Sequence, residues 1–198
     1  MLRPLASKRK YFQLPEPGWL KLDSLLNYEP SGDNSTGVEL RRPTILFAPT
    51  FTPRLSCAES LYAQIKIMAM LDKWQRLVIF HPKMAASTAA KYETLTGRNL
   101  DFGYSDRVID AMYRADVMVC DNLSILQEFL LLNKPVVIFN NRAPLTYFIN
   151  IDEPVQLELA ITTALNPSME LKEPIKTYGR LLPPNLMANL RHVFIALR

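Results

Sequence analysis

The chain has 198 residues, of which 48% are hydrophobic and 21% charged, and its formal net charge is +4. These values are ordinary for a globular protein with one large domain. The mild positive charge fits an anionic ligand or an anionic membrane surface, and it is too weak to indicate nucleic acid. We expect no membrane span, since no apolar stretch approaches the roughly 20 residues required, and no signal peptide, since no apolar run follows the basic start.

Residues 1–42 show little hydrophobic periodicity and are interrupted by prolines, glycines and the polar stretch SGDNSTG. We therefore predict an irregular lead-in and linker over 1–42 and a regular α/β domain over 43–198. In chain order, the domain pattern predicts a strand over 44–48, a helix from Ser56 to near Trp74, a strand over 77–80, helices over 85–95 and 106–113, a strand over 117–120, a helix over 124–132, a strand over 136–139, and helices over 154–167 and 186–197.

Three helix starts carry capping signals. Ser56 is followed three residues later by Glu59, which predicts a capping box. Ser105 is placed to cap the helix over 106–113. Asp152 or Glu153 is placed to cap the next helix, with Pro154 at its first position. The prolines at 167, 174, 183 and 184 predict an irregular connection before the last helix.

The predicted strands are apolar on both faces and alternate with helices, which indicates a parallel sheet covered on both sides. With right-handed crossovers this is a doubly wound α/β fold. Ligands of such sheets bind beyond the carboxyl ends of the strands. The chain contains neither GxGxxG nor GxxxxGK[ST], so neither a dinucleotide fingerprint nor an ATP-hydrolysing P-loop is indicated.

The two cysteines, Cys57 and Cys120, stand among apolar residues. We interpret them as reduced core thiols of a cytoplasmic protein. Neither belongs to a CxxC motif, and the chain has only two histidines, so we expect no metal site. No bound cofactor is expected either.

The stretch ADVMVCDNLSILQEFLLLNKPVVIF reads as strand, polar elbow, helix and strand. It places a helix N-terminus just past a strand end, where free N–H groups and the helix dipole suit a phosphate. Asp121 is expected to anchor the turn. Asn122 and Ser124 bind phosphate oxygens or simply cap the helix. Glu128, one turn below Ser124, holds a ribose diol or is a surface charge.

Two other strand ends carry polar groups. The loop APTFTPR offers the hydroxyl of Thr50 and the charge of Arg54, although an ordinary polar loop would look similar. His81 directly follows a strand, where it hydrogen-bonds a phosphate, donates a proton, or satisfies a neighbouring carbonyl. We predict that these strand ends open onto one pocket for a diphosphate.

At these residues the chain resembles the CDP-glycerol glycerophosphotransferase family, the teichoic-acid primases and polymerases. The resemblance rests on the ordered set GWLKLDSLL, ILFAPTF, FHP, YRADVMVCDNLSILQEF and NKPVVIF. It implies the donor-binding, C-terminal Rossmann-like half of a GT-B fold. It also implies that His81, as the catalytic residue, and Ser124 contact the nucleotide's phosphates, and that Glu128 holds the ribose. Asn122 stands where the family has Tyr.

The resemblance implies transfer of glycerol phosphate from CDP-glycerol to an acceptor hydroxyl in cell-envelope synthesis. The acceptor side would come from another chain or a preceding domain. Peripheral contact with the inner face of the membrane is also implied, because the family's acceptors are often lipid-linked. Two alternatives stay open: a nucleotide-sugar enzyme of the GT-B class, such as a UDP-N-acetylglucosamine 2-epimerase relative, and a non-catalytic nucleotide-binding or scaffold module.

Overall fold

The computed structural model describes residues 21–28, 41–71, 73–97, 99–121 and 125–180. The chain divides into two compact units, and the described part of the first is residues 21–28. That part contains helix α2 (Lys21–Leu26), so the prediction that the whole lead-in is irregular is wrong there. A six-residue helix spans fewer than two turns, too short to produce a visible hydrophobic period. The predicted domain boundary at residue 42 stays a prediction.

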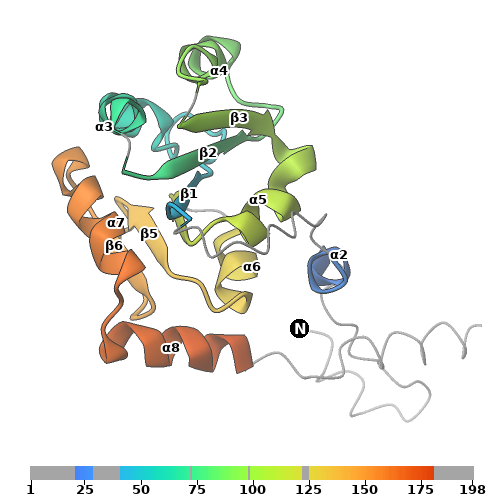
Figure 1. Ribbon diagram of the computed structural model, residues 1–198, viewed down its shortest axis with the longest axis vertical. Coiled ribbons are helices and arrows are strands. Elements are labelled where there is room, and N and C mark those ends of the chain that lie inside the picture. Colours follow the sequence, from blue (N-terminus) through green and yellow to red (C-terminus); the bar gives the residue numbers. More distant parts are fainter. Residues whose placement is uncertain (1–20, 29–40, 72, 98, 122–124, 181–198) are drawn as a thin grey trace, which may run out of the picture. The chain divides into compact units, whose positions relative to one another are not determined.

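The second unit contains a six-stranded sheet of order β3-β2-β1-β4-β5-β6 (Figure 1). All five neighbouring pairs are parallel. The strands are β1 (Thr44–Phe47), β2 (Gln75–Phe80), β3 (Leu100–Tyr104), β4 (Val117–Cys120), β5 (Val136–Phe139) and β6 (Phe148–Ile151). This confirms the predicted α/β fold, with the strand order reversing between β1 and β4.

Helices cover both faces of the sheet (Figure 1). On one face, α3 (Ala58–Met70), α4 (Ala86–Glu93) and α7 (Leu157–Leu165) pack over Phe47, Val119 and Val137. The opposite face is covered by α5 (Val108–Arg114) and α6 (Ile125–Leu131). The alternating strand residues Met118 and Ile138 are fully buried as well. Burial on both faces is the reason that these strands read as continuous apolar runs.

Three elements differ from the sequence prediction. β3 and β6 were not predicted, because LDFGY and FINI carry polar residues and form the two edges of the sheet. Helix α8 (Met169–Arg180) occupies the stretch predicted to be irregular and contains Pro174. The predicted helix over 186–197 lies outside the described residues.

The predicted helix caps had different outcomes. The capping box at Ser56 is wrong: Glu59 turns to α4, where it accepts hydrogen bonds from Lys91 (2.7 Å) and Thr88 (2.6 Å) that lower its pKa. Helix α3 also ends at Met70, before Trp74.

Ser105 does not cap a helix through its side chain; it begins the 3-10 turn η1 (Ser105–Arg107), which precedes α5. The predicted cap at Glu153 is confirmed, since Glu153 and Gln156 form a capping box over η2 (Pro154–Gln156), which leads into α7. In the part of the chain that the structure describes, no helix combines the length and apolar character needed to traverse a bilayer.

Candidate functional site

The site lies at the carboxyl edge of the sheet, where three adjacent strands end. β1 lies between β2 and β4, so the loops that carry Thr50, His81 and Asp121 leave from neighbouring positions. A hydrogen bond from Ala48 N–H to the Val119 carbonyl (3.0 Å) extends the β1–β4 contact to the end of the strands. The predicted meeting of three strand ends at one edge is therefore present.

Asp121 is a buried carboxylate that ties the β1–α3 loop to the end of β4. It accepts hydrogen bonds from the Thr50 N–H (3.0 and 3.1 Å to its two oxygens) and from the Cys57 N–H (2.9 Å). Only 2% of Asp121 is exposed. The sequence predicted that Asp121 anchors its own turn, and the structure shows that it anchors the loop that follows β1.

The two cysteines pack around this carboxylate. Burial, and then the charge of Asp121, raise the pKa of Cys57 and of Cys120 well above the usual thiol value. Both thiols are free and buried. They are therefore neutral core groups at physiological pH, as the sequence predicted, and not nucleophiles.

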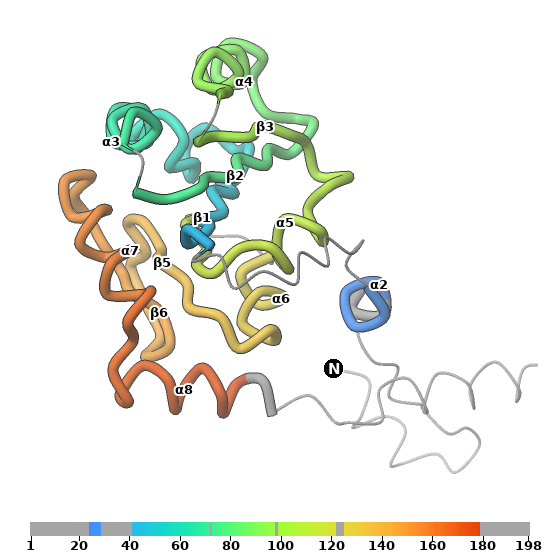
Figure 2. Tube along the Cα trace, viewed as in Figure 1, coloured from blue at the N-terminus to red at the C-terminus, as the bar shows by residue number. Residues whose placement is uncertain are grey.

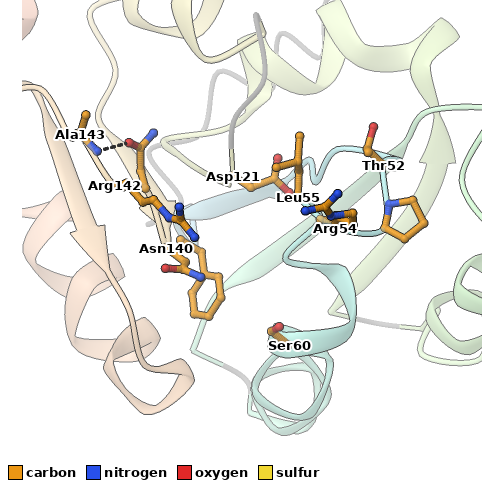
Figure 3. Close-up of a pocket in the computed structure, with 12 residues that line it drawn as sticks. Thr52, Arg54, Leu55, Ser60, Asp121, Asn140, Arg142 and Ala143 are labelled. Atoms are coloured by element: carbon orange, nitrogen blue, oxygen red, sulfur yellow. Dashed lines mark hydrogen bonds between the residues drawn. The ribbon is translucent and has the colours of Figure 1, made fainter.

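A pocket of about 840 Å³ opens beyond the ends of β1, β4 and β5 (Figure 3). One wall is the β1–α3 loop and the start of α3, and the other is the turn after β5. Asp121 lies between them. The lining residues are Thr52, Pro53, Arg54, Leu55, Ser56, Ser60, Asp121, Phe139, Asn140, Asn141, Arg142 and Ala143.

Two arginines enter this pocket from opposite walls, Arg54 from the β1–α3 loop and Arg142 from the turn after β5 (Figure 3). Within the described residues, neither guanidinium has a carboxylate partner. Among the described residues, five other basic side chains form ion pairs, namely Arg41–Asp116, Lys73–Glu158, Lys91–Glu59, Arg107–Asp101 and Arg114–Asp110. The pocket therefore presents two guanidiniums to a ligand, and guanidiniums bind phosphate and carboxylate groups well.

His81 lies beside the pocket rather than in its lining. Its exposed ring stacks on Phe51, with centroids 4.4 Å apart and an interplanar angle of 30°. Its Nδ1 accepts a hydrogen bond from the Lys83 N–H (3.0 Å). His81 therefore packs on Phe51 in the loop that follows β1, and Phe51 directly precedes the lining residue Thr52 in the chain.

The other predicted site residues are placed as follows. Thr50 is buried, with its N–H on Asp121, and does not line the pocket. Glu128 is 3% exposed on α6, which excludes a surface charge, and it is not a lining residue. Asn122 and Ser124 lie outside the described residues. Of the predicted set, the structure places Arg54 and Asp121 in the pocket.

Sequence reasoning missed the wall formed by Asn140, Asn141 and Arg142. The signal was present, since polar residues directly follow the strand VVIF as they follow the other strands. Ser60 was also missed, because it lies on the first turn of α3 rather than in a strand-end loop. Across the described ranges, no three residues of the types His, Cys, Asp and Glu come together to hold a metal ion.

A parallel sheet of this order, with a pocket beside the reversal, defines a Rossmann-like α/β domain. The model of one particular family, described as CDP-Glycerol:Poly(glycerophosphate) glycerophosphotransferase, matches residues 13–143. The chain belongs to this family, and it is a glycerophosphotransferase-like domain.

Solved structures share the fold at low identity. A variant of the wall teichoic acid polymerase TagF soaked with CDPG matches with a TM-score of 0.50 and 16% identity, over 69% of this chain and 35% of that one. The UDP-GlcNAc 2-epimerase from Neisseria meningitidis bound to UDP-GlcNAc matches with a TM-score of 0.51 and 11% identity, over 78% and 43%. A putative UDP-N-acetylglucosamine 2-epimerase from Listeria monocytogenes matches with a TM-score of 0.51 and 11% identity, over 93% of this chain and 47% of that one.

These matches confirm the predicted GT-B-type, Rossmann-like fold. The chain spans about a third of the TagF chain and less than half of the two epimerase chains. No curated protein matches it.

Proposed function

We propose that this chain binds the nucleotide diphosphate of a donor such as CDP-glycerol, as the donor-binding part of a glycerophosphotransferase. The observation that carries the proposal is the pair Arg54 and Arg142, which enter one pocket from opposite walls without carboxylate partners among the described residues. Family membership supports the choice of CDP-glycerol, as does the related TagF structure soaked with CDPG. The pocket's place at the strand reversal supports a nucleotide ligand.

In the proposed reaction an acceptor hydroxyl oxygen attacks the phosphorus of the glycerol phosphate group. The bond from that phosphorus to the bridging oxygen breaks, and CMP leaves with the oxygen and its negative charge. The hydroxyl proton passes to a base that the acceptor side supplies. The two guanidiniums neutralise the charge that develops on the leaving CMP. We propose that the acceptor side belongs to another chain or a further domain, and that it meets this domain at the inner face of the membrane.

His81 is proposed to donate a hydrogen bond to the nucleotide's phosphates through Nε2. Its Nδ1 accepts the Lys83 N–H, so this atom carries no proton and the neutral ring holds its proton on Nε2. In this state the ring is a hydrogen-bond donor toward a ligand. We also propose that Asn122, Ser124 and Thr50 bind phosphate oxygens and that Glu128 holds the ribose.

His81→Gln and His81→Asn distinguish a donor at Nε2 from one at Nδ1. The glutamine amide reaches the place of Nε2, whereas the shorter asparagine amide reaches only that of Nδ1. We expect His81→Gln to weaken CDP-glycerol binding by less than about threefold and His81→Asn by about tenfold. Calorimetric titration measures both. Equal losses in the two variants would contradict donation from Nε2.

Titration of the full chain with CDP-glycerol, CMP and UDP-N-acetylglucosamine tests the proposed function itself. We expect CDP-glycerol to bind most tightly, and CMP to bind more weakly because it lacks the second phosphate. Tighter binding of UDP-N-acetylglucosamine would assign the pocket to a nucleotide sugar. Binding of none of the three would overturn the proposal in favour of a scaffold module.

A further inference from the structure

The turn after β5 is unusually constrained for a pocket wall. β5 and β6 are parallel neighbours, yet only residues 140–147 connect them, without a helix (Figure 2). Parallel neighbours generally need a connection of about a dozen residues or more. The chain must therefore turn away from the carboxyl edge directly after β5 in order to reach the start of β6. The turn at residues 140–143 is accordingly restricted in the conformations that it can adopt.

Hydrogen bonds from β6 hold this turn. The side chain of Asn150 accepts from the Asn141 N–H (3.1 Å) and donates to the Asn141 carbonyl (3.1 Å). The Asn141 side chain then accepts from the Ala143 N–H (2.9 Å), a contact drawn in Figure 3. Asn140 donates its N–H to the Ile151 carbonyl (2.7 Å) and has a φ of 54°, in the left-handed region that asparagine tolerates better than most residues.

These contacts bracket Arg142, the charged residue of the turn. The backbone on both sides of Arg142 is fixed, through Asn141 on one side and Ala143 on the other. Arg142 itself is exposed in the pocket and makes no hydrogen bond with any described residue. A guanidinium on a preorganised backbone loses less freedom on binding an anion than one on a mobile loop, which increases affinity.

We propose that Asn150 is a positioning residue for the phosphate site: it does not line the pocket, and it sets the pocket's affinity for a nucleoside diphosphate by locking the turn that presents Arg142. The proposal rests on the proposed function, because it assumes that the anion in the pocket is the nucleotide's diphosphate. It adds a residue on β6, one strand away from β5, to the groups that determine binding.

A double-mutant cycle on the full chain tests this role, with CDP as the titrated ligand. We expect Arg142→Ala to weaken CDP binding by about tenfold and Asn150→Ala by about threefold to fivefold. In the Arg142→Ala background, Asn150→Ala should change affinity by less than about twofold, because the group that it positions is gone. A purely structural role for Asn150 would give the same loss in both backgrounds, and that result would overturn the proposal.

Two matched controls complete the cycle. Asn166→Ala removes another exposed asparagine that bonds to backbone, at the far end of α7, and should leave CDP affinity unchanged. Arg114→Ala removes one positive charge from the last turn of α5, away from the pocket, and should also have no effect. If the parent protein binds no CDP, the proposed function fails; if it binds CDP and Arg142→Ala weakens binding but Asn150→Ala does not, only this inference fails.

Discussion

Asp121→Ala is expected to lower the free energy of unfolding by about 4 kcal/mol, the largest stability effect of a single substitution at the site. The substitution leaves the buried N–H groups of Thr50 and Cys57 without their acceptor. Each unsatisfied buried donor costs about 1–3 kcal/mol. The loop that carries Arg54 also loses its attachment to β4, so CDP-glycerol affinity should fall together with stability.

Urea unfolding of Asp121→Ala, Asp121→Asn and a control measures this effect. Asp121→Asn should be intermediate, with a loss of about 2 kcal/mol, because one amide oxygen still accepts while the amide NH₂ faces an N–H group. The control is Asp101→Ala, which removes a carboxylate from an exposed pair with Arg107 (3.4 Å) and should cost less than about 1 kcal/mol. A loss below about 1 kcal/mol for Asp121→Ala would contradict the anchoring role.

The interior of the sheet was predictable from the sequence, and its edges were not. β1, β4 and β5 are buried on both faces, so their residues form continuous apolar runs that indicate strands directly. β3 and β6 lie at the edges and carry Asp101 and Asn150. Edge strands need apolar residues on fewer positions, and the short apolar runs that remain there do not distinguish a strand from a loop.

The place of the site was predictable, but the role of each side chain was not. Polar residues after buried strands indicated the correct edge, since parallel strands all end there. Asp121, selected from the sequence, lines the pocket, yet its carboxylate meets backbone N–H groups of a loop more than sixty residues away in the chain. Whether a strand-end carboxylate meets a ligand or a backbone donor depends on the path of that loop, which no local pattern specifies.

Arg142 illustrates the same limit. It follows two asparagines after β5, and its immediate sequence is that of an ordinary surface turn. Only the three-dimensional structure places it opposite Arg54, without a carboxylate partner among the described residues. A positive pocket made of two distant segments has no signature in either segment alone.

The double variant Arg54→Ala/Arg142→Ala is expected to weaken CDP-glycerol binding by about 100-fold, or about 2.7 kcal/mol, the largest effect on ligand affinity. Each single substitution should account for about tenfold, because the two guanidiniums lie on separate walls and share no contact among the described residues. The dependence of affinity on salt should also become weaker, since two positive charges at the site are lost. Isothermal titration at two salt concentrations measures both effects.

The matched control is Arg107→Ala/Arg114→Ala. It also removes two positive charges, but from exposed ion pairs with Asp101 and Asp110. If the net charge of the chain determined affinity, the two double variants would lose binding equally. If the pocket determines affinity, the control variant should bind CDP-glycerol within about twofold of the parent protein. Because Arg54 and Arg142 are exposed, the pocket variant should keep the parent's thermal unfolding temperature, and a large fall in that temperature would attribute the lost affinity to unfolding rather than to the missing guanidiniums.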